Sequence, residues 1–555
     1  MEPFDLLFRG GLVVDGTGSP PRRADVGLRG DRIERVAPDL PAGRARKILA
    51  MEGRILCPGF IDLHSHSDLL FALGGAAGTR LLEGRVRQGI TTELVGNCGI
   101  GVAPLVEQSF PAIRFVTGFI TPEGVGWEWR GIGEYLNRLE SIGVPLNVGT
   151  LIGHGAVRLA AMGMRAGPPT GSQFLRMEEM IEAGLAEGAF GISFGLIYPP
   201  GLYADTDELV RLCRVAASRQ RFACFHQRGG GRENLLHSVR EIIEVGIRSG
   251  ASVHHSHDHA QGRRAWDLLP RVIAMEEEAI DRGLDLTQDV IPYPSVCTTM
   301  LAIYPSWALA EGVQPFLAKL RDPACRKRMQ RDMEQADASW PPWEPHRWAL
   351  NIVRDVGWEN IQIAHLNRPG NRRYIGMDLA RLAGVTGKDP FTAISDLVLD
   401  EDGILTQMLF GISGDRENEE PLKLLLRHPT RSFVTDAWDI GSGSPHPGAY
   451  GTYPRVLGRF AREQKLFPVE EAIRKMTSLP AARMGLSDRG VVREGARADL
   501  VVFDPVTVRD RSDYLRPRTF PDGIEHVVIN GQPVVSGGKW LESKAGRVLR
   551  PGGTA

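Results

Sequence analysis

The central part of this chain alternates regularly between short apolar segments with strand character and longer segments with helical spacing. Apolar residues recur every three to four positions in the helical segments, of which the clearest are 176–188, 207–220, 235–248 and 266–282. Eight strand-like segments lead into a polar residue, and these residues are His64, Cys98, His154, Tyr198, His226, His257, Tyr293 and Asp436. This alternation predicts an α/β fold, a TIM-type (β/α)8 barrel.

The two ends of the chain show a different pattern, in which short strands are separated by turn residues. Residues 12–14 precede Asp15-Gly16 near the start, and residues 500–503 precede Asp504-Pro505 near the end. Neither end is long enough to bury a core alone, so we expect both to combine into one small β-sandwich. The expected domains are residues 1–58 for the first part of the sandwich, 59–485 for the barrel and 486–555 for the second part of the sandwich.

Residues 294 to about 360 form an expected insertion after the seventh strand of the barrel. The segment is rich in proline and contains five tryptophans, at positions 307, 340, 343, 348 and 358. It is either a packed subdomain without a catalytic role or a lid that closes over the barrel mouth and excludes water.

Composition limits the class of partner. The formal net charge is -1 and no long basic or acidic run is present, which argues against nucleic acid or an anionic membrane and favours a small-molecule substrate. No apolar segment approaches about 18 residues and the N-terminus lacks a signal-peptide pattern, so we expect a cytoplasmic protein. Six dispersed cysteines without a C-x-x-C pair indicate neither a disulfide framework nor a structural zinc site. The oligomeric state, including a homo-oligomer, is left open.

The strongest chemical signal is the pair His64 and His66 at the end of a strand-like segment. Side chains alternate along a strand, so two histidines separated by one residue point to the same side and can hold one metal ion. Four more metal-binding side chains follow other predicted strands, and they are Cys98, His226, His257 and Asp436. Because the carboxyl ends of barrel strands meet at one face, we expect the six residues to form a divalent metal site with a position open for water.

Cys98 differs from the other five cysteines. An isolated cysteine is usually a small buried hydrophobic residue, which is our interpretation of the cysteines at positions 57, 213, 224, 297 and 325. Cys98 instead ends a predicted strand between Asn97 and Gly99, on the face where the histidines gather. A thiolate at this place suits zinc.

Short motifs follow one another along the whole chain. They are PGFIDLHSH at 58–66, GNCG at 96–99, GHGAVR at 153–158, GLIYPP at 195–200, FHQR at 225–228, SH at 256–257, DVIPY at 289–293 and GTYPRVLG at 451–458. Together they resemble the N-acyl-D-amino-acid deacylase (D-aminoacylase) family of the amidohydrolase superfamily. The resemblance implies a zinc-dependent amide hydrolase with a barrel and a β-sandwich.

The same resemblance implies a role for each metal-binding residue. Cys98, His226 and His257 would hold one tight zinc ion. His64, His66 and Asp436 would surround a weaker second site, which Cys98 bridges to the first.

Asp436 and four further residues are the candidates for catalysis and substrate binding. Beside the attacking water, Asp436 would accept a proton and pass it to the leaving amine. The candidates for substrate binding are His154, Tyr198, Arg228 and Tyr293. For His154 a structural role is equally open.

Two positions depart from the family pattern. Relatives commonly have tyrosine at the position of Ile291 and arginine at the position of Gly448, and the resemblance assigns both to the grip on the substrate carboxylate. We therefore expect weak discrimination between a free acid and its uncharged amide or ester, and a stronger preference for the acid in Gly448→Arg. If another carboxylate anchor exists, we expect it at Arg228 or Arg158.

These observations predict zinc-dependent hydrolysis, by metal-activated water, of an amide bond outside a peptide chain. The most direct case is deacylation of an N-acyl-D-amino acid or a related small amide. A cyclic amidase, a lactonase or a deaminase on the same scaffold would keep the same metal residues, so these stay as alternatives. A binding protein without activity is disfavoured, because all six metal-binding candidates are present.

Overall fold

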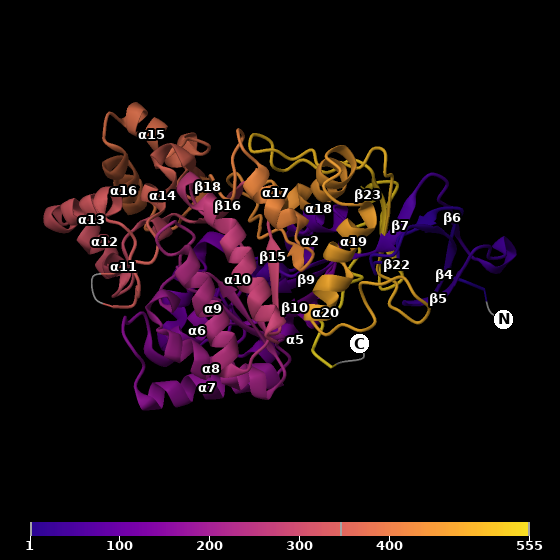
Figure 1. Ribbon diagram of the computed structural model, residues 1–555, viewed down its shortest axis with the longest axis horizontal. Coiled ribbons are helices and arrows are strands. Elements are labelled where there is room, and N and C mark those ends of the chain that lie inside the picture. The colour runs from indigo at the N-terminus through magenta and orange to yellow at the C-terminus, as the bar shows by residue number, and fades with distance from the viewer. Residues whose placement is uncertain (1–2, 345–346, 553–555) are drawn as a thin grey trace.

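The computed structural model describes residues 3–344 and 347–552 of the chain. The molecule is elongated, with a barrel at its centre (Figure 1). A β domain that contains the N-terminus lies at one end, and a mainly helical subdomain lies at the other.

Eight parallel strand positions form the barrel. The third position is split at Leu151 into β10 and β11. The strands are β8 (Phe60–Asp62), β9 (Ile90–Val95), β10 (Asn147–Thr150) with β11 (Ile152–Gly153), β12 (Gly191–Gly195), β13 (Phe222–His226), β14 (Val253–His255), β15 (Leu286–Val290) and β19 (Arg431–Phe433). The last strand lies beside the first, because the Asp436 N–H donates to the His64 carbonyl at 2.9 Å. The expected α/β barrel is confirmed.

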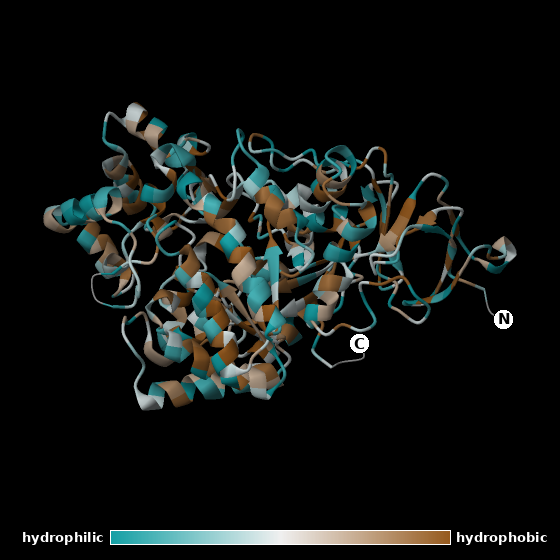
Figure 2. Ribbon diagram, in the orientation of Figure 1, coloured by the Kyte–Doolittle hydropathy of each residue, from teal (hydrophilic) through white to brown (hydrophobic). Residues whose placement is uncertain are grey.

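Amphipathic helices cover the outside of the barrel. Those expected from the sequence correspond to α7 (Gly171–Ala186), α8 (Thr206–Ser218), α9 (Leu235–Ser249) and α10 (Leu269–Asp281). Helix α8 begins where the Asp205 carboxylate accepts a hydrogen bond from the Glu208 N–H, and α9 ends at Gly250 in the left-handed conformation. Brown and teal residues alternate along these helices in Figure 2, as expected when one face is buried.

The β domain combines both ends of the chain. Its strands from the N-terminal part are β1 (Leu6–Arg9), β2 (Leu12–Val13), β3 (Arg22–Arg23), β4 (Asp25–Arg29), β5 (Arg32–Ala37), β6 (Ile48–Ala50) and β7 (Ile55–Pro58), and those from the C-terminal part are β20 (Leu500–Phe503), β21 (Ile524–Ile529), β22 (Gln532–Ser536) and β23 (Lys539–Trp540). One sheet has the order β5-β4-β1-β6, and the other has the order β23-β22-β21-β20-β7-β2-β3. Strand β7 pairs antiparallel with β20, so that Leu56 faces Val502. The expected sandwich is confirmed.

The insertion is larger than the range 294–360 expected from the sequence. Strands β16 (Ser295–Thr299), β17 (Ile361–Leu366) and β18 (Leu405–Phe410) form one antiparallel sheet in the order β16-β18-β17. An apolar core of its own joins this sheet to the helices, and it includes Phe316, Ile363 and Ile394. The pairing joins strands more than 100 residues apart, which local periodicity does not reveal.

We propose to keep the domain boundaries close to residues 58 and 485. The first follows β7 directly, and the second follows α20 (Ser478–Arg483). Within the described ranges, no helix is both long and apolar enough to cross a lipid bilayer.

Candidate metal centre

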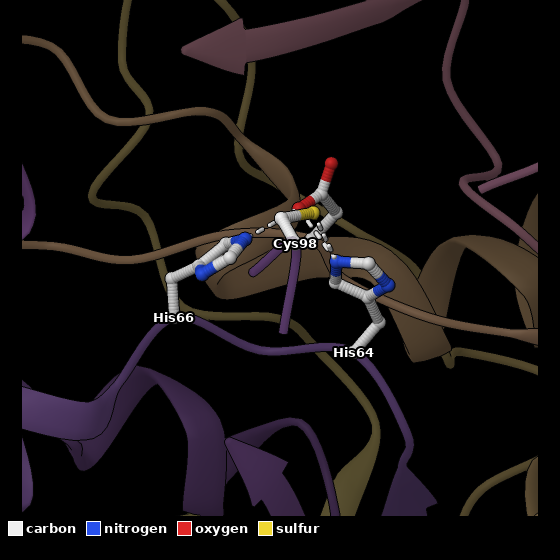
Figure 3. Close-up of side chains that lie close together, drawn as sticks. His64, His66 and Cys98 are labelled. Atoms are coloured by element: carbon white, nitrogen blue, oxygen red, sulfur yellow. Dashed lines mark hydrogen bonds and ion pairs between the residues drawn. The ribbon is translucent and has the colours of Figure 1, made fainter. Parts of the chain in front are cut away.

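All six metal-binding candidates lie at the carboxyl-terminal mouth of the barrel. His226 is the last residue of β13, and the other five follow their strands by two to four residues. None of the six is more than 9% exposed. Figure 3 shows the imidazoles of His64 and His66 on opposite sides of the Cys98 thiol.

The first group of donors consists of Cys98, His226 and His257. The Cys98 Sγ lies 3.4 Å from His226 Nδ1 and 3.4 Å from His257 Nε2. All three donor atoms lie within 4.8 Å of one another. One sulfur and two nitrogens leave a fourth tetrahedral position open, which is the composition of a catalytic zinc site.

The protonation of these two histidines fits a metal-binding role. Burial lowers the pKa of His226 and that of His257 to about 4, so both rings are neutral at neutral pH. A neutral imidazole has a free lone pair for a metal ion.

The second group consists of His64, His66, Cys98 and Asp436, with donor atoms again within 4.8 Å of one another. His64 Nε2 lies 3.2 Å from Cys98 Sγ and 3.4 Å from Asp436 Oδ1. His66 Nε2 lies 3.2 Å from the same carboxylate oxygen. Because Cys98 belongs to both groups, its thiolate is placed to bridge two metal ions.

Cys98 is electrostatically distinct from the other buried cysteines. Burial opposes ionisation of its thiol, but the charge of His64 and the contacts of the sulfur with ring nitrogens of His64 and His226 outweigh burial and hold the pKa well below its usual value. Burial alone raises the pKa of the Cys57 and Cys213 thiols. Only a thiolate binds zinc strongly, so the environment of Cys98 fits the metal.

The backbone is strained at three of the six residues. Cys98, His257 and Asp436 have φ values of 54°, 34° and 42°, in a region that costs a residue with a Cβ about 1–3 kcal/mol. Close packing maintains this conformation at Cys98, since a Cβ on Gly195 would overlap the Cys98 carbonyl. Strain of this kind is typical of functional sites.

Asp289, to which the sequence analysis assigned no role, supports the donors from behind. Its carboxylate accepts a hydrogen bond from the His257 N–H and lies 3.6 Å from His64 Nδ1 and 2.8 Å from His254 Nε2. Burial would raise its pKa, but His254 and His64 hold the pKa well below the usual range. A carboxylate behind a histidine fixes the ring orientation and favours metal binding. The sequence feature that could have indicated this role is an acidic residue inside a predicted barrel strand.

A third cluster, formed by His255, Asp258 and Glu276, is not a metal site. The Arg431 guanidinium donates to Asp258 Oδ2 at 2.6 Å and to Glu276 Oε2 at 2.5 Å. His255 Nδ1 lies 2.7 Å from the other oxygen of Glu276. The arginine therefore occupies the place of a cation, and the cluster is a buried ion-pair network.

Tyr198 is the one substrate-binding candidate of the four that lines the cavity beside the metal donors. Its ring centre lies 5.2 Å from that of His226, and its hydroxyl lies 2.7 Å from Thr298 Oγ1. This cavity encloses about 460 Å³ of space, part of it open to solvent. Strands β16 and β18 of the insertion contribute to its wall through residues such as Val296 and Leu409.

His154, Arg228 and Tyr293 lie elsewhere. His154 Nε2 lies 2.8 Å from Glu208 Oε1 in a fully buried position. Arg228 donates to Glu241 and to two backbone carbonyls, and its side chain is also fully buried. Tyr293 is 2% exposed and packs edge-on against His446, with ring centres 5.0 Å apart. Their partners indicate structural roles.

Gly448→Arg is expected to lower the thermal unfolding midpoint and not to strengthen carboxylate binding. A Cβ at Gly448 would lie 2.9 Å from both His446 Nδ1 and Thr452 Oγ1, and 3.3 Å from the Thr435 carbonyl. Overpacking of this kind costs about 1–3 kcal/mol. Differential scanning fluorimetry should show a loss, smaller in the control Gly448→Ala. An unchanged midpoint together with a gained preference for the free acid would contradict the steric argument.

A parallel barrel that gathers cysteine, histidine and aspartate donors at its mouth defines a metal-dependent hydrolase. Residues 47–535 match the Amidohydrolase family, and full-length relatives match as well. The chain therefore belongs to the amidohydrolase family and, within it, to the N-acyl-D-amino-acid deacylases.

Two relatives and one solved structure describe this similarity. An N-acyl-D-glutamate deacylase of Alcaligenes xylosoxydans xylosoxydans is 34% identical over 549 residues, which are 99% of this chain and 97% of the relative. A D-aminoacylase of the same organism is 30% identical over 551 residues, 99% of this chain and 98% of the relative. The crystal structure of the N-acyl-D-glutamate deacylase from Bordetella bronchiseptica, complexed with zinc and a phosphonate mimic of the tetrahedral intermediate, has a TM-score of 0.79 at 30% identity and covers 99% of this chain and 100% of that one.

Proposed function

We propose that this protein is a zinc-dependent hydrolase that removes the acyl group from an N-acyl amino acid or a related small amide. The observation that carries the proposal is the pair of donor groups that share Cys98 at the barrel mouth, where His226, His257 and Asp436 line a cavity. The names of the two relatives described above, an N-acyl-D-glutamate deacylase and a D-aminoacylase, support the same reaction. The protein's partner is a small-molecule substrate. A cytoplasmic location and the oligomeric state stay predictions.

The donor chemistry fits zinc at both groups. Cys98, His226 and His257 would hold the tight ion, and His64, His66 and Asp436 would hold a weaker second ion with Cys98. When bound, zinc supplies a Lewis acid that makes water nucleophilic near neutral pH and polarises the amide carbonyl.

Asp436 is proposed to move the proton. Burial would raise its pKa, but the charge of His64 and the hydrogen bond with His66 outweigh burial and hold the pKa well below the usual range. The group is therefore a carboxylate at neutral pH. It lines the cavity, so its oxygen can take a proton from the attacking water and return it to the leaving amine nitrogen.

Tyr198 is proposed to orient the substrate. Burial and the nearby Cys98 raise the pKa of Tyr198 well above its usual value, so its hydroxyl stays protonated. The hydroxyl faces the cavity beside Thr298, where it can donate a hydrogen bond to the oxygen of the acyl group.

A hydrolysis screen of the zinc-loaded protein tests the proposed reaction. We expect acyl release from linear N-acetyl amides with kcat/KM at least about tenfold above that for small lactams and lactones, because two relatives that match 99% of this chain are named as an N-acyl-D-glutamate deacylase and a D-aminoacylase. Products are identified by mass spectrometry, and ammonia is assayed separately. Preferred ring opening would instead identify a cyclic amidase or lactonase, and release of ammonia alone would identify a deaminase.

A further inference from the structure

The cavity beside the metal donors lacks a fixed positive charge. Among the residues that the structure describes, no lysine or arginine lines this cavity or the two that adjoin it at Cys297 and at Ile197 with Tyr198. Its polar wall consists of hydroxyl, amide and imidazole groups from residues such as Tyr198, His259, Gln261 and Thr298, together with the carboxylate of Asp436. A free carboxylate on the substrate would have no charged partner there other than the metal.

We propose that the preferred substrate is an uncharged amide, in which the carboxylate next to the scissile nitrogen is absent or masked as an amide or ester. This inference rests on the proposed function and specifies its substrate class. An N-acyl amino acid places a carboxylate one carbon from the scissile nitrogen, so that group must enter the same cavity. Recognition of a buried carboxylate ordinarily uses arginine or lysine.

The two arginines that the sequence offered as carboxylate anchors are buried and paired with glutamates elsewhere. Arg228 donates to both oxygens of Glu241, at 2.8 and 3.1 Å, and to the carbonyls of Leu202 and Ala204. Arg158 donates to both oxygens of Glu208, at 3.1 and 2.9 Å. Both arginines are 0% exposed, so neither can turn toward a substrate without breaking a buried ion pair.

His259 lines the cavity, and one of its ring nitrogens is already in use. Its Nδ1 lies 2.6 Å from the His257 carbonyl, which can only accept, so Nδ1 donates this hydrogen bond. The amide nitrogen of Gln227 is already bound to the His259 carbonyl at 2.9 Å.

The two positions that depart from the family pattern supply no alternative anchor. Ile291 is 6% exposed and belongs to an apolar cluster with Leu63, Tyr293 and Val434. Gly448 lies in a space that has no room for a Cβ.

A matched pair of substrates tests this inference. N-acetyl-D-methionine and N-acetyl-D-methioninamide share the scissile bond and the side chain and differ only in the charged group. The loss of one charge-assisted hydrogen bond lowers kcat/KM or affinity by roughly 10- to 150-fold. We expect kcat/KM for the amide to exceed that for the acid by about tenfold or more. A preference for the acid of several hundred-fold would overturn the inference and leave the proposed deacylation intact.

Equilibrium binding provides a readout without turnover. Calorimetry with the metal-free full-length protein and the same two compounds should show at least about tenfold tighter binding of the amide. Tighter binding of the acid would overturn the inference even if neither compound is hydrolysed. The absence of hydrolysis of both compounds by the zinc-loaded protein would instead count against the proposed function.

A variant that introduces a positive charge tests whether the carboxylate of the acid, or the carboxamide of the amide, lies in this cavity. Val296 lines the cavity from β16 and is partly exposed, so Val296→Lys can place an ammonium group there, and Val296→Met is a neutral control of similar length. We expect Val296→Lys to raise the ratio of acid to amide kcat/KM by about tenfold or more and Val296→Met to leave it unchanged. An unchanged ratio in folded, zinc-loaded Val296→Lys would show that this group lies outside the cavity and would overturn the inference.

Discussion

Cys98→Ala is expected to remove tight zinc binding and hydrolysis together. The Cys98 sulfur lies 3.4 Å from one nitrogen of His226 and of His257 and 3.2 Å from His64, so its removal deprives both donor groups of their shared atom. Zinc binding in small structural sites is worth about 10–16 kcal/mol, and one bond of three corresponds to a loss on the order of 1000-fold in affinity.

Metal analysis and activity assays on the same preparation measure both effects. Cys213→Ala is the matched control, because Cys213 is a fully buried cysteine of α8 without a contact to the metal donors. The control should keep zinc and activity, with at most a small loss of stability. Zinc bound to Cys98→Ala with the affinity of the unmodified protein would rule out the thiolate as a ligand.

Asp436→Asn is expected to lower turnover by roughly 100-fold or more while the tight zinc stays bound. The substitution keeps the shape of the side chain but removes the basic oxygen that lies 3.2 Å from His66 Nε2. The tight group of Cys98, His226 and His257 does not include Asp436, which is why its metal should be retained.

Asp439→Asn tests whether any buried carboxylate near the mouth would have the same effect. The Asp439 carboxylate is bound to Arg518 and to the Tyr450 hydroxyl, and it lies outside both donor groups. We expect the turnover of Asp439→Asn to change by less than about tenfold. A much larger loss in Asp436→Asn would then be specific to Asp436. Unchanged turnover in Asp436→Asn with zinc bound would show that another group is the base.

The insertion lines the cavity, which is relevant to the lid hypothesis. Val296, Cys297 and Thr298 of β16 and Leu409 of β18 belong to the cavity wall. The segment therefore shapes the substrate pocket, and its movement during catalysis stays a prediction. The segment also has an apolar core of its own, which is expected of a packed subdomain, the other alternative.

The sequence by itself was sufficient to predict the barrel and the sandwich and to single out six candidate metal donors. These features depend on local properties: strand and helix periodicity, turn residues, and the two-residue spacing of His64 and His66 at a strand end. Parallel strands in a barrel bring their carboxyl ends together, so residues with no proximity in sequence, such as Cys98 and His257, were expected to meet. The structure brings their donor atoms to 3.4 Å.

Only the tertiary structure decided which of the polar residues near the barrel face the cavity. His154 and Arg228 follow barrel strands just as the metal donors do, but each pairs with a glutamate from a covering helix, Glu208 of α8 and Glu241 of α9. The lack of room at Gly448 and the contacts of Asp289 with the histidines also depended on the tertiary structure. The physical reason is that residue type and spacing determine the direction of a side chain along its own element, whereas its partner and the room around it depend on packing between elements distant in sequence.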